Sequence, residues 1–290
     1  MFDRKVLKQR AKYVLSRSFL MSIVACGIVS LVSGGLMTYN VQNVGNVNFS
    51  GMSNIRVAAT FAVAGIAVLL AVAFSIFVTA PLKVGLRRFM LSAADGDTNL
   101  ENLLFPFKNN YKNIVWVTFV KNLYIGLWSM LVLIPILVGS WGYFDEINEM
   151  ISAVQNDSVT AAMALMLTTS ALSLIMIVFL VPAIIKELQY SMVEYILAEN
   201  PDSKVRETIG KSKELMVGNK WAYVKLMLSF VGWQLVAGFV CCVGGLILAP
   251  YMEATYTQMY LEISGQGKDY PGYDYQNPFS QNPFDNFRNM

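Results

Sequence analysis

The sequence predicts an all-α fold, a polytopic bundle of transmembrane helices. The main observation is that five mostly apolar stretches, each at least 23 residues long, contain no Asp, Glu, Lys or Arg: 18–55, 57–82, 122–144, 158–185 and 226–252. A helix needs about 20 such residues to cross a hydrocarbon core roughly 30 Å thick. Helices also pair every backbone N–H and C=O inside lipid. Finally, 55% of the residues are hydrophobic and 14% are charged, unlike an average soluble domain.

The charges are distributed unevenly along the chain. Lys and Arg cluster at the N-terminus and in the intervals 83–121 and 186–225, whereas the interval 142–158 has four acidic residues and no basic one. Because Lys and Arg collect on the cytoplasmic side of membrane proteins, we expect a multi-pass cell-membrane protein with a cytoplasmic N-terminus.

The last apolar stretch has room for two spans. Trp221 to Val240 can form the fifth, Gly244-Gly245 the turn, and Leu246 to Ile263 a more polar sixth. Six spans return the C-terminus to the cytoplasm. We therefore expect a single transmembrane helical domain over residues 1–264.

A threefold pattern supports six spans. Each even-numbered span contains a proline, Pro81, Pro182 or Pro250, and then continues as a helix. Each odd-numbered span follows a basic amphipathic stretch: 2–17, 104–121 and 203–220. Searching for repeats comes before naming a fold. The pattern predicts three helical hairpins, each preceded by an amphipathic interfacial elbow helix.

The first and third elbow helices have the clearest patterns. In the first, an apolar stripe of Leu7, Ala11, Val14 and Ser18 lies opposite the basic residues. The third is expected to begin with a side-chain cap from the Pro201-Asp202-Ser203 segment and to end at Gly218. Such helices lie on the inner membrane surface, where each basic residue near anionic headgroups is worth about 1 kcal/mol.

Signals for catalysis are missing from the sequence. There is no histidine, and the three cysteines, Cys26, Cys241 and Cys242, lie in apolar segments. Cys26 ends a segment similar to a lipoprotein cleavage site, but the apolar run continues to Met37, which favours an uncleaved first span. No metalloprotease, nucleophile-elbow or phosphate-loop motif occurs. We therefore predict no enzyme activity, no catalytic residue, no metal site and no cofactor.

Several polar and aromatic residues are candidates for a functional or a packing role. The Gln234 amide, at mid-membrane, should face another helix or a wet cavity. The other candidates are its neighbour Trp233 and, in the sixth span, Glu253, Tyr251, Tyr256 and Tyr260. A solvated salt-bridge network is also expected between Lys186, Glu187, Glu194 and Glu199 on one side and Arg87, Arg88 and Lys211 on the other.

The segment 265–290 is rich in Gly, Pro, Asn and Tyr. It contains Asn-Pro-Phe twice, at 277–279 and 282–284, and has few aliphatic residues. This composition predicts a disordered cytoplasmic tail, in which the repeated motif has either no separate role or a role in peptide docking.

The C-terminal half resembles an uncharacterised family of integral membrane proteins, known mainly from Gram-positive bacteria and catalogued as a domain of unknown function. The resemblance rests on the segments 190–201, 212–221 and 228–233, and on Ala249-Pro250-Tyr251 with Thr255 and Tyr260. It implies a plasma-membrane location and six helices, but no reaction and no catalytic residues.

Three functions remain open. The first is a non-catalytic membrane module associated with envelope or export processes. The second is a permease or carrier for an apolar or peptide-like solute, and the third is a lipid-modifying enzyme that uses Glu253. Expected partners are membrane lipids, through their anionic headgroups, and a membrane protein or a second copy of the chain. No nucleic acid is expected.

A reporter fused after Met290 tests the number of spans. If the reporter is active only outside the cytoplasm, we expect it to be silent, because an even number of spans leaves both termini inside. An active reporter, in a fusion present at normal level in the membrane, would indicate five spans.

Overall fold

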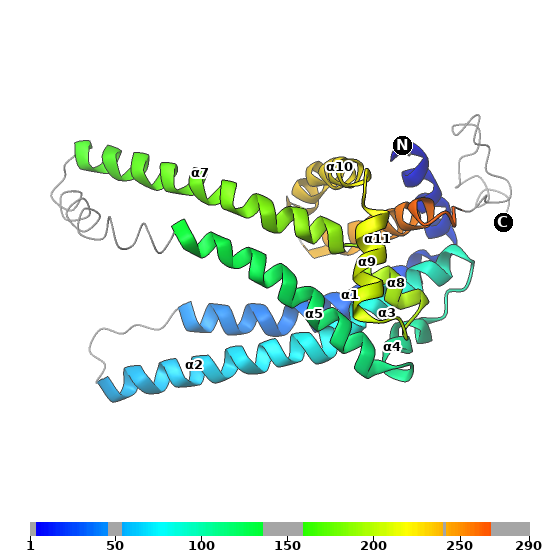
Figure 1. Cartoon of the computed structure of the whole chain (residues 1–290), viewed down its shortest axis with the longest axis horizontal. Coiled ribbons are helices and arrows are strands. Elements are labelled where there is room, and N and C mark those ends of the chain that lie inside the picture. Colours follow the sequence, from blue (N-terminus) through cyan, green and yellow to red (C-terminus); the bar gives the residue numbers. More distant parts are fainter. Residues whose placement is uncertain (1–3, 46–53, 136–158, 240–241, 268–290) are drawn as a thin grey trace. The chain divides into compact units, whose positions relative to one another are not determined.

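The computed structural model describes residues 4–45, 54–135, 159–239 and 242–267, and within these ranges it contains helices and no strand (Figure 1). This confirms the predicted all-α class. The predicted tail, from residue 268 onward, lies outside the described residues. The helices are α1 (Arg4–Gly45), α2 (Asn54–Phe74), the π-helix η1 (Ser75–Thr79), α3 (Ala80–Ala94), the 3₁₀ helix η2 (Leu100–Leu104), α4 (Phe105–Lys108), α5 (Tyr111–Ser129), the 3₁₀ helix η3 (Met130–Val132), α7 (Val159–Tyr190), α8 (Val193–Glu199), α9 (Val205–Leu215), α10 (Lys220–Phe239) and α11 (Cys242–Ile263).

Four helical stretches in the described part of the chain are long and apolar enough to cross a membrane: Arg4–Ser33, Ala62–Ala94, Tyr111–Pro135 and Met176–Glu199. They support a membrane protein. The six-span arrangement, which needs α10 and α11 as its fifth and sixth spans, stays a prediction, as do the interfacial position of the elbow helices and the orientation of the termini.

The chain forms two compact units. The first comprises Met1–Phe119 and Met192–Met290, and the second comprises Val120–Ser191. In the second unit, α7 continues through Pro182, the ring of Tyr124 lies 6.4 Å from that of Tyr190, and the Lys186 ammonium lies 4.8 Å from the centre of the Trp128 ring.

In the first unit, the helix of the second span continues past Pro81 because the backbone around it is rearranged. Proline has no N–H and its ring clashes with the carbonyl four residues earlier, which here is that of Phe77. The π-helix η1 contains Phe77 and ends immediately before α3. The Phe77 carbonyl accepts a hydrogen bond from the Tyr111 hydroxyl at 2.6 Å. The acceptor displaced by the proline is therefore satisfied by α5.

Helix α1 bends at Ser18 (φ −123°, ψ 15°), where the charged N-terminal part meets the charge-free run. The predicted stripe of Leu7, Ala11, Val14 and Ser18 is buried. However, the stripe packs on protein. Leu7 forms a buried cluster with Leu226 and Phe230 of α10 and Met259 of α11, and Ala11 forms another with Ala254 of α11. An amphipathic stripe fits a protein groove as well as a lipid surface, so the pattern alone does not identify its partner.

Helix α9 begins without the predicted side-chain cap. Its N-cap residue is Lys204, which makes no capping hydrogen bond. The Asp202 carboxylate instead accepts a hydrogen bond from the Asn110 amide at 2.7 Å, and the Ser203 hydroxyl contacts the Asn200 carbonyl and the Thr208 hydroxyl. Gly218, with φ +76°, lies in the turn after the helix, as expected for a glycine that ends it.

Helix α3 packs closely against η2 in the core of the first unit. Cys26 and Val29 of α1, Leu86 and Phe89 of α3, and Leu103 of η2 form one buried cluster. The approach requires a glycine, because a Cβ added at Gly85 would lie 2.0 Å from the Leu103 carbonyl oxygen. The neighbour is backbone and cannot rotate away.

Replacing Gly85 with alanine is expected to lower the melting temperature in detergent, because overpacking costs about 1–3 kcal/mol or more. Gly65→Ala is the matched control, since nothing lies within 4 Å of a Cβ at this α2 position. Alanine there should leave stability unchanged or raise it by up to about 1 kcal/mol. Equal melting temperatures for the two variants would contradict the close packing of α3 on η2.

Candidate functional site

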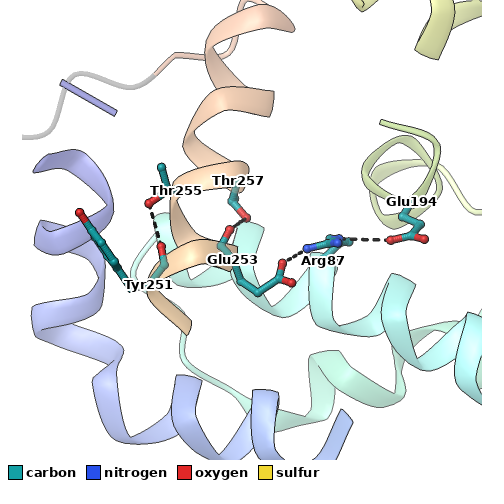
Figure 2. A network of polar contacts seen from close by, with 6 residues as sticks. All are labelled: Arg87, Glu194, Tyr251, Glu253, Thr255 and Thr257. Carbon is teal, nitrogen blue, oxygen red and sulfur yellow. Dashed lines mark hydrogen bonds and ion pairs between the residues drawn. The ribbon is translucent and has the colours of Figure 1, made fainter. Parts of the chain in front are cut away.

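Arg87 is the centre of a charged cluster built by three helices of the first unit (Figure 2). Its Nε lies 3.3 Å from Oε2 of Glu194 on α8, and its Nη1 forms an ion pair with Oε2 of Glu253 on α11. The three side chains are only 18%, 14% and 22% exposed. The expected salt-bridge network therefore exists in part, but it is half-buried, and its second carboxylate comes from Glu253.

Aromatic rings surround this cluster. The Arg87 guanidinium lies 4.9 Å from the centre of the Tyr195 ring, a cation–π contact. Tyr195 stacks on Tyr260 with ring centres 4.8 Å apart, and the Tyr260 hydroxyl donates a hydrogen bond to Glu199 at 2.7 Å. Arg88, the next residue on α3, donates to the Ala198 carbonyl at 3.1 Å. Helices α3, α8 and α11 are thus joined by several polar contacts.

Beside Arg87 lies a cavity of about 260 Å³. It is bounded by residues of α1, α3, α8 and α11. Its lining combines charged and apolar side chains: Cys26, Val29, Ser30, Lys83, Leu86, Arg87, Glu194, Ala249 and Glu253. In the described part of the chain, no group of three or more His, Cys, Asp or Glu residues is arranged to hold a metal ion. The lining is suited to a polar ligand that complements both signs of charge.

The candidate residues chosen from the sequence do not all meet at this cavity. Glu253 lines it, and Tyr260 supports Arg87 through Tyr195. Tyr251 and Tyr256 pack edge-on against Phe230, with ring centres 5.6 and 6.0 Å away. On α10, Trp233 is exposed, and exposed Gln234 donates a weak hydrogen bond to the Met252 sulfur at 3.6 Å. A functional role for these six residues remains a prediction.

Three lining residues that carry a polar or thiol group were not selected from the sequence as site candidates: Lys83, Cys26 and Ser30. Lys83 and Arg87 are four residues apart, so they share one face of α3. The sequence feature that could have identified Lys83 is therefore the pair of positive charges, one helical turn apart, shortly after Pro81. Nothing in the sequence associates Ser30, inside an apolar run, with these charges.

The whole helical region matches one known protein family. Residues 1–267 match the family model described as "Protein of unknown function (DUF975)". The chain belongs to the DUF975 family. The match contains all of the charged residues around Arg87. No curated protein and no solved structure matches the chain. The membership thus confirms the resemblance to an uncharacterised family, and the DUF975 description supplies no activity.

Replacing Glu253 with glutamine is expected to destabilise the protein by about 1–3 kcal/mol, because a charge-assisted contact to half-buried Arg87 is lost. Glu214→Gln, at an exposed position on α9, is the control and should have almost no effect. Thermal unfolding of the purified proteins in one detergent measures both. If the Glu253→Gln protein unfolds at the same temperature as the control, the ion pair does not contribute to stability.

Proposed function

We propose that this DUF975 protein is a non-catalytic, multi-pass protein of the cell membrane that binds a small polar ligand in the cavity beside Arg87, in support of envelope or export processes. The observation that carries the proposal is the cavity itself, a polar space lined by Lys83, Arg87, Glu194 and Glu253 next to apolar helices. Ionisable residues within membrane segments are costly, and they are found mainly at functional sites.

The position along α1 supports a ligand site within the bilayer. Cys26 and Ser30 lie 8 and 12 residues beyond the bend at Ser18, which is about 12 and 18 Å along a helix that rises 1.5 Å per residue. If the bend marks the inner surface, where the basic residues end, the cavity lies near the midplane of a hydrocarbon core roughly 30 Å thick, with Cys26 before the midplane and Ser30 beyond it. A ligand would reach it from the cytoplasm or from the inner leaflet.

A binding role agrees with the contacts of the acidic residues. The Glu253 carboxylate, the one candidate for interfacial enzyme chemistry, forms an ion pair with Arg87, which also contacts Glu194. Such carboxylates orient a guanidinium and hold helices together. General acid–base catalysis would require a carboxylate that is directed at a reacting group.

Anionic lipids are the proposed surrounding partners. The exposed basic residues Arg4, Lys12 and Arg17 lie on the part of α1 before or at its bend, while the opposite apolar stripe packs on protein. Basic side chains near an anionic surface contribute about 1 kcal/mol each, so these residues would anchor the inner end of the bundle.

A carrier is the second candidate, and a specific observation favours it. The second span contains the π-helix η1 immediately before α3, and Pro250 lies inside α11; α3 and α11 both line the cavity. Interrupted helices beside a polar cavity are common in secondary transporters. Solute flux into reconstituted vesicles distinguishes a carrier from a protein that binds its ligand without moving it.

Water access to the cavity tests the proposed binding role. In a protein with Cys26, Cys241 and Cys242 replaced by serine, Ser30→Cys should react with a water-soluble thiol reagent at least ten times faster than Leu31→Cys. Both residues are exposed, but Ser30 lines the cavity and its neighbour Leu31 does not. Equally slow labelling of both variants, in proteins that are folded, would mean a dry cavity and would exclude the binding role.

A further inference from the structure

We propose that the cavity binds a small zwitterion, a molecule that carries a primary ammonium and a carboxylate or phosphate a few bonds apart. This inference rests on the proposed binding function and names the class of ligand. It follows from the placement of four charges, two of each sign, along the lining of one cavity.

The acidic side of the cavity attracts a cation. Glu194 and Glu253 share one guanidinium, so this group of three side chains has a formal charge of −1. A carboxylate offers about four lone-pair sites, and contact with Arg87 leaves acceptor positions on the pair. An ammonium has three donors and fits these positions without displacing Arg87.

The basic side is Lys83. It lies one helical turn before Arg87 and lines the same cavity. Like charges four residues apart on a helix repel each other. Arg87 is compensated by two carboxylates, whereas the exposed ammonium of Lys83 makes no ion pair within the described ranges. The four side chains are together formally neutral, so a ligand whose anionic group binds at Lys83 and whose ammonium binds at the glutamates leaves the net charge of the site unchanged.

The size of the cavity limits the ligand. Its 260 Å³ is just below the range of about 300–1,000 Å³ for typical small-molecule sites, which favours a small ligand. The apolar lining residues Val29, Leu86 and Ala249 leave space for a short aliphatic group. Two sources of this chemistry fit, a free amino acid or dipeptide and the phosphoethanolamine headgroup of a lipid.

A purely structural role, in which the ion pairs only hold the helices together, does not explain the arrangement. Such a structural role requires only that Arg87 contacts the two glutamates, and the side chains around the three residues would normally be closely packed. The cavity and the uncompensated Lys83 are additional features that a structural role does not require.

Protection of the cysteine at position 30 tests the inference. The protein with Ser30→Cys and no other cysteine is reconstituted in phosphatidylcholine vesicles, and its labelling rate is measured with alanine, with propionate and with propylamine. A second set of vesicles contains phosphatidylethanolamine, whose primary ammonium replaces the quaternary ammonium of phosphatidylcholine. We expect labelling to slow at least fivefold either with alanine, which identifies a free solute, or in the phosphatidylethanolamine vesicles, which identifies a lipid headgroup.

Lys83→Gln in the same protein should abolish most of this protection. Lys83 is exposed and lies outside the ion-paired group, so the variant is expected to remain folded. Protection by propionate or propylamine equal to that by alanine would overturn the zwitterion while leaving a ligand-binding cavity. Rapid labelling that neither alanine nor phosphatidylethanolamine slows would also overturn it. If the proposed binding function itself is wrong, the result is different, because Ser30→Cys would then not react with the thiol reagent at all.

Discussion

The ion pairs of Arg87 are the interaction on which the inner part of the first unit depends. They join α3, α8 and α11 through Arg87, Glu194 and Glu253, residues that lie more than 50 positions apart in the chain. Removing one partner of such a half-buried pair is expected to cost about 1–3 kcal/mol, because the remaining charge loses part of its compensation. Glu194 and Glu253 must therefore stay near α3, and the helices that carry them are positioned by that requirement.

Helix α11 makes the largest variety of these contacts. Glu253 pairs with Arg87, Tyr260 donates to Glu199, and Glu262 forms an ion pair with Arg10 of α1 at 2.7 Å. Met259, on the same helix, packs with Leu7. The polar residues that make this predicted sixth span more polar than the others thus have protein partners. Their pairing accounts for charged side chains in a helix that is otherwise apolar.

The local patterns of the sequence were informative wherever neighbouring residues decide the outcome. The charge-free runs predicted long helices, and the prolines at 81, 182 and 250 were correctly interpreted as positions through which a helix continues. The stripe from Leu7 to Ser18 was correctly predicted to be apolar on one face and is buried. The predicted cap at Asp202 and Ser203 was wrong, because the Asp202 side chain bonds to distant Asn110 and the Ser203 hydroxyl to Asn200 and Thr208. The side-chain oxygen of a capping residue can accept a hydrogen bond from other nearby donors instead of from the helix N–H groups.

The sequence by itself determined the helical class, the apolar stretches that suit a membrane, and the family, since these follow from composition and short-range periodicity. It also indicated that acidic residues of the segment 186–199 could pair with Arg87, Arg88 or Lys211. Only the tertiary structure decided that the second carboxylate is that of Glu253 and that Lys83, Ser30 and Cys26 line the same cavity. Pairing between segments far apart depends on how the helices pack, and hydrophobic periodicity specifies which face of a helix is buried but not what it is buried against.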